Sequence, residues 1–101
     1  MAQEYIKQHI KDPSSVAVYG LDWTEWLDER ETTIAQSFWT PQTGSGLAVD
    51  SSAIVSGDKV TQVVVSGGTE NATAVYGLTN RIITASGLQE ERTLGLSIAQ
   101  R

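Results

Sequence analysis

The sequence predicts a small all-β fold: an immunoglobulin-like antiparallel β-sandwich of about seven strands with a short N-terminal helix. From residue 16 onward, short runs of β-branched and aromatic residues alternate with turns rich in Gly, Asn, Asp and Ser. The last run, residues 89–99, alternates most cleanly, with Leu94, Leu96 and Ile98 on one face. Short strands separated by turn signals are typical of two packed antiparallel sheets, and a small barrel is the alternative.

Composition limits both the size and the chemistry of the domain. The chain has 101 residues, which is enough for one hydrophobic core. Its net charge of −5 disfavours binding to nucleic acid, because an acidic surface repels the phosphate backbone. There is no cysteine, so disulfides, thiolate catalysis and cysteine-ligated metals are excluded.

The first residues predict a short helix over 2–11. Ile6 and Ile10 are spaced i, i+4, and so are Tyr5 and His9, which is a helical period. The Asp-Pro pair that follows ends the helix, since a residue before proline is pushed out of the α region. About ten residues are too few for an isolated helix in water, so this one either packs on something or frays.

We therefore expect two parts, an N-terminal helical arm at 1–12 and a sandwich domain at 13–101. The arm has three interpretations: a frayed terminus, docking onto its own domain, or docking onto a partner. The third makes its amphipathic face a partner-binding site. The residues of that candidate site are Tyr5, Ile6, His9 and Ile10.

The stretch from residue 19 to 27 contains two of the three tryptophans. We expect the first strand, 16–22, to end here and turn a corner through one helical turn at 24–29. Trp23 or Trp26, or both, then close the open end of the β core, because one buried indole is a large share of so small a core.

The later strands are expected at 32–40, 47–49, 53–55, 59–65, 74–84 and 89–99. Within the first of these, Ile34 and Phe38 share a face while Trp39 has the opposite one, so either a bulge redirects the chain or one aromatic is exposed. The side chains expected in the core are Trp23, Ile34, Val63 or Val64, Tyr76, Leu78, Leu94, Leu96 and Ile98.

The residues of known chemistries do not come together in this sequence. The single histidine, His9, lies in the expected arm, so no serine or threonine has a base beside it, and one histidine cannot form a zinc site. The charged run 28–31 is interpreted as a solvated loop, with Ca²⁺ binding as the alternative, although the EF-hand spacing is absent. We expect no enzyme activity, no cofactor and no metal.

Targeting signals are not evident either. No apolar run approaches the length of a membrane span, and the first residues have neither the basic nor the apolar region of a signal peptide. Because the chain begins with Met and carries no obvious tag, we expect it to be the whole natural protein.

A series of landmarks in this order resembles the fiber-tail adaptor proteins of tailed bacteriophages. Each motif is weak, but together they span residues 11–98. The landmarks are Lys11-Asp12-Pro13, Asp22-Trp23, Trp26-Leu27, Ile34 to Trp39, Gly46-Leu47, Val63 to Thr69, Tyr76 to Asn80, Thr84 to Gly87 and Glu91 to Leu94. Residues 1–10 precede the usual start of the family, and the run 28–31 is more charged than expected, which leaves the partner open.

The resemblance implies a virion protein with an immunoglobulin-like sandwich that joins fibers or neighbouring structural proteins to the tail. The implied partners are tail or fiber subunits, and the protein itself in a symmetric ring, with no nucleic acid and no membrane. It implies assembly into the virion tail after synthesis in the host cytoplasm. A capsid decoration protein or a receptor- or glycan-binding module is the alternative function.

Overall fold

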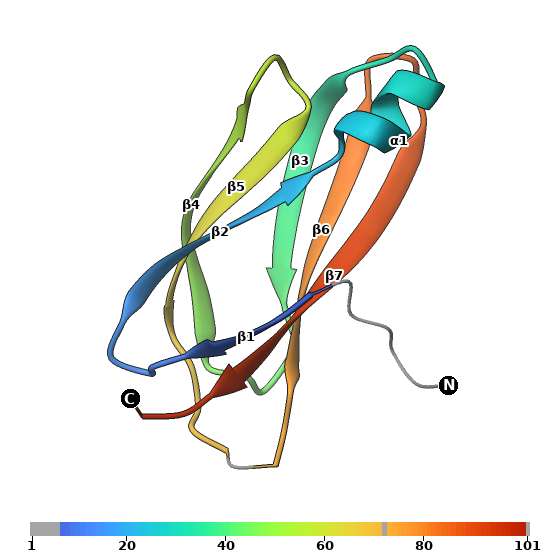
Figure 1. Cartoon of the computed structure of the whole chain (residues 1–101). Coiled ribbons are helices and arrows are strands. Elements are labelled where there is room, and N and C mark those ends of the chain that lie inside the picture. The colour runs from blue at the N-terminus through green and yellow to red at the C-terminus, as the bar shows by residue number, and fades with distance from the viewer. Residues whose placement is uncertain (1–6, 72, 101) are drawn as a thin grey trace.

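Seven strands and one short helix make up the part of the chain that the computed structural model describes, residues 7–71 and 73–100 (Figure 1). Six of the strands, from residue 16 onward, run in the expected order, and the second strand has the expected bounds. The elements are β1 Lys7–Lys11, β2 Val16–Asp22, α1 Thr24–Glu29, β3 Ile34–Pro41, β4 Leu47–Val55, β5 Val60–Gly67, β6 Tyr76–Thr84 and β7 Gln89–Ile98.

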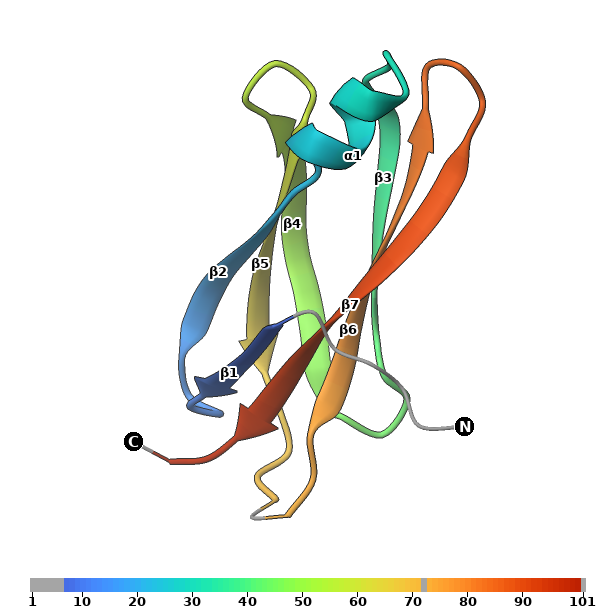
Figure 2. The ribbon, with the colours of Figure 1, turned by 45° about the vertical axis from the view of Figure 1, so that its right-hand side comes forward.

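The strands form two sheets that face each other, which confirms the predicted all-β sandwich (Figure 2). One sheet has four strands in the order β1-β7-β6-β3, and the other has three in the order β2-β5-β4. The orders β2-β5-β4 and β7-β6-β3 match strands B-E-D and G-F-C of an immunoglobulin domain. The difference lies in the first strand, which pairs with the last strand, in parallel, rather than with the second.

The helix expected over residues 2–11 is wrong where the structure describes it, because Lys7–Lys11 is strand β1. A segment this short fits both a helical and an alternating pattern, so tertiary contacts decide its conformation. The free edge of β7 supplies a parallel ladder, in register from Lys7 opposite Leu94 to Lys11 opposite Ile98. Residues 2–6 of the expected helix lie outside the described residues.

Two bulges account for the side-chain facing in β3 and for the course of β4. In β3 the register shifts between Ile34 and Gln36, so Ile34 and Trp39 both face the core and Phe38 stays 40% exposed. In β4 the register shifts between Val49 and Ser51, and the two short strands expected at 47–49 and 53–55 are one continuous strand. A bulge inserts one residue and so changes which side chains point inward.

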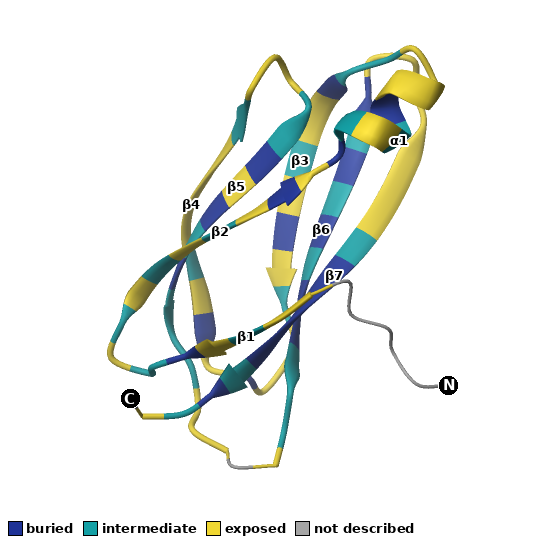
Figure 3. Ribbon diagram, viewed as in Figure 1, coloured by how far each residue is buried: buried dark blue, intermediate teal, exposed yellow. Residues whose placement is uncertain are grey.

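The core lies between the sheets and continues under α1, where Trp23 and Leu27 are fully buried (Figure 3). The expected core residues are buried, with two refinements. Val63 rather than Val64 faces inward, and Tyr76 is only half-buried, packed against the core at the end of β6. Of the two tryptophans expected to close the core, Trp23 does so and Trp26 is half-buried beside it.

Asn80 on β6 joins the two sheets inside this core. Its Oδ1 accepts hydrogen bonds from Trp23 Nε1 at 3.0 Å and from Thr61 Oγ1 at 2.7 Å. Its Nδ2 donates to Ser37 Oγ at 2.9 Å and to the carbonyl of Phe38 at 3.0 Å. The amide is fully buried, and these bonds use the four places that an asparagine side chain offers.

Leu96→Ala tests the facing of the last strand. The Leu96 side chain is fully buried, so we expect the variant to lose about 2–5 kcal/mol of unfolding free energy through lost transfer energy and a residual cavity. Urea unfolding measures it. Leu88→Ala is the matched control, since Leu88 is 44% exposed in the β6–β7 hairpin and should change stability by less than about 0.5 kcal/mol. Equal unfolding midpoints for the two variants would contradict the assigned facing.

Candidate interaction surfaces

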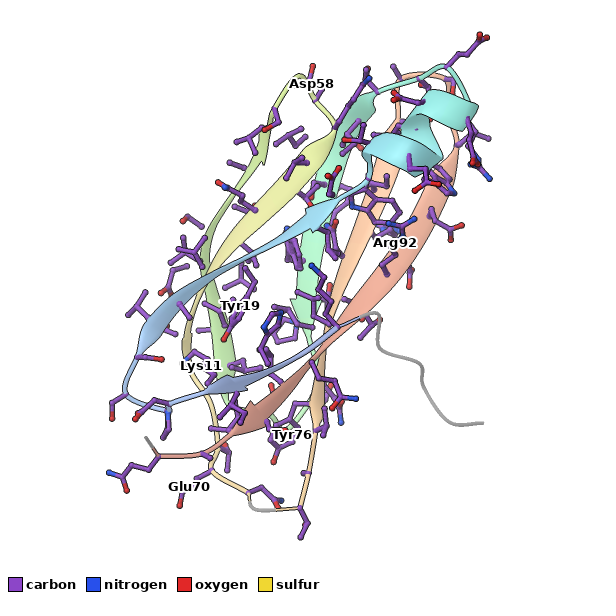
Figure 4. The ribbon with its side chains drawn as sticks, viewed as in Figure 1. Lys11, Tyr19, Asp58, Glu70, Tyr76 and Arg92 are labelled. Carbon is purple, nitrogen blue, oxygen red and sulfur yellow. The ribbon has the colours of Figure 1, made fainter. Side chains whose placement is uncertain are left out.

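The end of the sandwich that carries α1 is organised by two tryptophans and two arginines. The rings of Trp23 and Trp26 meet edge to face, with centroids 5.7 Å apart. The Arg92 guanidinium lies 4.2 Å from the centroid of Trp23, and that of Arg30 lies 4.3 Å from the centroid of Trp26. Such cation–π contacts fix two long side chains across apolar rings. These contacts cap this end of the core, where Figure 4 labels Arg92.

Carboxylates surround this cap. Asp22 accepts a hydrogen bond from the backbone N–H of Thr24 at 2.9 Å. The pKa of the Asp22 carboxyl is lowered mainly by a hydrogen bond from the Thr24 side chain, and next by the bond from the Thr24 backbone N–H. Asp28 on α1 forms an ion pair with Lys59 in the β4–β5 turn, with Nζ and Oδ1 2.5 Å apart. The acidic side chains on α1 and on the turns and strands beside it are Asp22, Glu25, Asp28, Glu29, Glu31, Asp58 and Glu90.

At the opposite end of the sandwich, hydrogen bonds from Lys11 hold the β1–β2 turn to the end of β5. The side chain is 1% exposed, and Nζ donates to the carbonyls of Asp12 at 2.9 Å, Ser15 at 2.7 Å and Gly67 at 2.6 Å. Burial lowers the pKa of this ammonium group, while the Asp12 and Asp50 carboxylates raise it. The bond to Gly67 links a strand of the four-stranded sheet to the three-stranded sheet.

The side of the sandwich where β1 and β2 lie carries the candidate residues that the structure describes. His9 is half-buried, and its ring lies 5.1 Å from that of Tyr19 on β2 (Figure 4). Ile10 points the other way and is 55% exposed. Val16 and Val18 on β2 are 66% and 63% exposed. Three of the five exposed large apolar side chains in the described chain thus lie on these two strands.

The outer face of the four-stranded sheet has a shallow groove of about 570 Å³. Phe38, Arg81 and Glu91 line it, with the Arg81 guanidinium 4.8 Å from the ring centroid of Phe38. Small-molecule sites are mostly apolar and enclose their ligand. This open groove mixes one aromatic ring with opposite charges, which is more typical of a protein contact.

The structure describes two of the four residues of the sequence-predicted site, His9 and Ile10. Tyr5 and Ile6 lie outside the described residues, and the structure separates His9, which faces Tyr19, from Ile10, which faces solvent. Sequence reasoning missed Lys11 as a buried anchor and the exposed valines of β2. The alternation of β2 gave the signal for the valines, but not which face the core would cover.

Within 7–71 and 73–100, no group of three or more His, Cys, Asp or Glu side chains is placed to hold a metal ion. Across the same ranges, no helix has the length and apolar character needed to cross a bilayer.

This small β-sandwich is closed at one end by packed tryptophans, held at the other by the hydrogen bonds of Lys11, and has exposed strand edges. These are features of a protein-interaction module. The family described as Podophage GP4 fiber-tail adaptor protein gp77 matches residues 11–97, and the chain belongs to this family. This confirms the resemblance seen in the sequence landmarks and gives the chain a structural role in a phage virion. No curated protein sequence matches the chain.

Lys11→Met tests whether the buried ammonium holds the β1–β2 turn to β5. Methionine keeps most of the apolar stem but removes the Nζ donor from the carbonyls of Ser15 and Gly67, while the Asp12 carbonyl keeps its two hydrogen bonds from Ser15. We expect a loss of about 1–3 kcal/mol for a buried carbonyl left unsatisfied, measured by urea unfolding. Lys7→Met is the control, because Lys7 is exposed on the same strand. A Lys11→Met variant as stable as the Lys7→Met variant would show that the anchor contributes nothing.

Proposed function

We propose that this chain is a non-enzymatic adaptor that joins tail fibers, or neighbouring structural proteins, to the tail of a podophage virion. The match to the fiber-tail adaptor family over residues 11–97 carries the proposal. Such a role needs surfaces rather than an active site, since an adaptor acts by burying area against other subunits, typically about 1,200–2,000 Å² in a specific complex.

The side of the sandwich formed by β1 and β2 is the proposed contact with other virion proteins. Ile10 is exposed there on an edge strand, and His9 lies under it on the face toward Tyr19. Together with Tyr5 and Ile6 from the preceding segment, these residues form the partner-binding set that the sequence suggested. The two described members of this set, His9 and Ile10, lie on strand β1 rather than on a helix.

Several copies around the tail are part of the same proposal, since most protein assemblies repeat one contact under rotational symmetry. Synthesis would take place in the host cytoplasm, followed by incorporation into the virion tail. The net charge of −5 supports protein rather than nucleic-acid partners.

The test uses tails assembled in the absence of this protein. Purified wild-type chain is added, sedimented with the tails, and fiber attachment is counted by electron microscopy. We expect wild-type chain to bind and restore fibers, and Ile10→Asp to bind at least about tenfold more weakly, because a charge replaces an apolar contact. Leu88→Asp, the same change at an exposed apolar position in the β6–β7 hairpin, away from β1 and β2, is the matched control.

Two results would contradict the adaptor role, and a third would contradict only the assignment of Ile10 to its surface. Binding of the wild-type chain to capsids but not tails would indicate a decoration protein. Binding to host cells or glycans without tail binding would indicate a receptor module. Tail binding by Ile10→Asp at the wild-type level would retain the adaptor role and remove Ile10 from its surface.

A further inference from the structure

The two sheets have four outer edges in the described chain, and three of them carry features that block pairing with another strand. β1 is five residues long and places Lys7 in solvent. β3 has a bulge at Ala35 and ends in Pro41. β4 has a bulge at Asp50. Short length, lysine, proline and bulges are the devices that proteins use to keep sheet edges from pairing.

The edge of β2 has none of these devices. β2 pairs with β5 in unbroken register over seven residues, from Val16 opposite Ser66 to Asp22 opposite Val60. No charged residue interrupts it before Asp22, and it contains no proline. Within the described chain, no strand pairs with its other side. A long, regular, uncharged edge is a template for an additional strand.

One hydrogen bond shows which backbone groups point along this free edge. The N–H of Trp23 donates to the carbonyl of Lys59 at 2.9 Å, which continues the β2–β5 register by one pair. In an antiparallel ladder, hydrogen-bonded pairs alternate with pairs whose backbone groups point away. Tyr19 and Leu21 therefore direct their N–H groups to β5, while the N–H and C=O groups of Val16, Val18 and Gly20 point outward.

The side chains beside this edge define the chemistry of an added strand. On the outer face of the three-stranded sheet, exposed Val18 lies next to Val64, which lies next to Ser51. On the inner side lie the rings of Tyr19 and His9. From Val16 to Leu21 the side chains of β2 carry no charge, whereas charges gather at its Asp22 end, where Lys7 and Arg92 lie near the carboxylate. A complementary strand thus carries uncharged side chains on both faces.

We propose that the free edge of β2 binds an extended, uncharged segment of another tail protein, which adds to β5 and β4 as the fourth strand of that sheet. This inference rests on the adaptor function proposed above and deepens it by naming the surface and the kind of partner. Strand addition gives affinity through backbone hydrogen bonds and specificity through alternate side chains. A second copy of this chain is the weaker occupant, because pairing two β2 edges brings together two molecules of net charge −5.

Hydrogen exchange on the wild-type chain tests the proposal without any substitution. In the free chain, the amides of Val18 and Gly20 exchange fast and those of Tyr19 and Leu21 slowly. On tails assembled without this protein and then loaded with it, residue-resolved mass spectrometry should show Val18 and Gly20 becoming protected by at least about tenfold, as expected for amides that enter a ladder. Unchanged exchange at Val18 and Gly20 in tail-bound chain overturns the proposal.

Val18→Pro gives a second test, because it deletes an outward N–H without removing a β2–β5 hydrogen bond. Proline is tolerated at such positions of an edge strand. We expect tail binding about tenfold weaker than wild type, because one edge hydrogen bond is lost and the proline ring stands where the added strand approaches. Val18→Thr keeps the N–H and a β-branched side chain, and should bind like wild type. If Val18→Pro fails to fold, as judged by its melting curve, the exchange measurement decides alone.

The outcomes separate this proposal from the adaptor function. Wild-type binding with a weakened Val18→Pro and an unaffected Val18→Thr supports strand addition. Equal binding by all three overturns the edge and leaves the adaptor role standing. No tail binding by the wild-type chain overturns the adaptor role, and with it this inference. A wild-type dimer in solution that Val18→Pro dissociates assigns the edge to a second copy and overturns the heterologous partner.

Discussion

The buried Asn80 amide is the interaction on which the arrangement of this sandwich depends. It sits on β6 and bonds Trp23, which follows β2, Thr61 on β5, and Ser37 and Phe38 on β3. Both sheets and the corner before α1 are thus joined at one fully satisfied polar group. A hydrophobic core is compatible with several offsets between two sheets. A buried amide with four partners has all its hydrogen bonds at only one of these offsets. Asn80 therefore fixes the position of Trp23, and Trp23 in turn supports the cap formed by α1.

Lys11 does at the base what Asn80 does near the cap, and the two anchors leave the side between them open. Lys11 holds the β1–β2 turn against the end of β5. β1 pairs with β7 in the other sheet, so β1 and β2 do not pair with each other. This divergence leaves the outer edge of β2 uncovered within the described chain. Side-chain hydrogen bonds anchor both ends, and a free edge lies between them. This arrangement suits an adaptor, because a pre-ordered surface loses less conformational entropy when it binds.

Local patterns predicted much of the fold. The alternation in β7, the bounds of β2 and the helical turn after Trp23 were all evident from the sequence, since each depends on nearby residues. β1 was mistaken for a helix, because its strand conformation depends on a ladder with β7, more than eighty residues away in the chain. The free edge of β2 was beyond prediction, since it depends on which strands pair with one another.

The most direct measurement is a cryo-electron microscopy map of the assembled tail that resolves this chain. The account predicts a strand of another protein beside β2 at the ordinary spacing of about 4.8 Å, with its backbone paired to Val16, Val18 and Gly20. It also predicts that the acidic surface around α1 does not make the main contact. A map in which β2 faces solvent, and the chain contacts the tail through α1 or the groove beside Phe38, would contradict it.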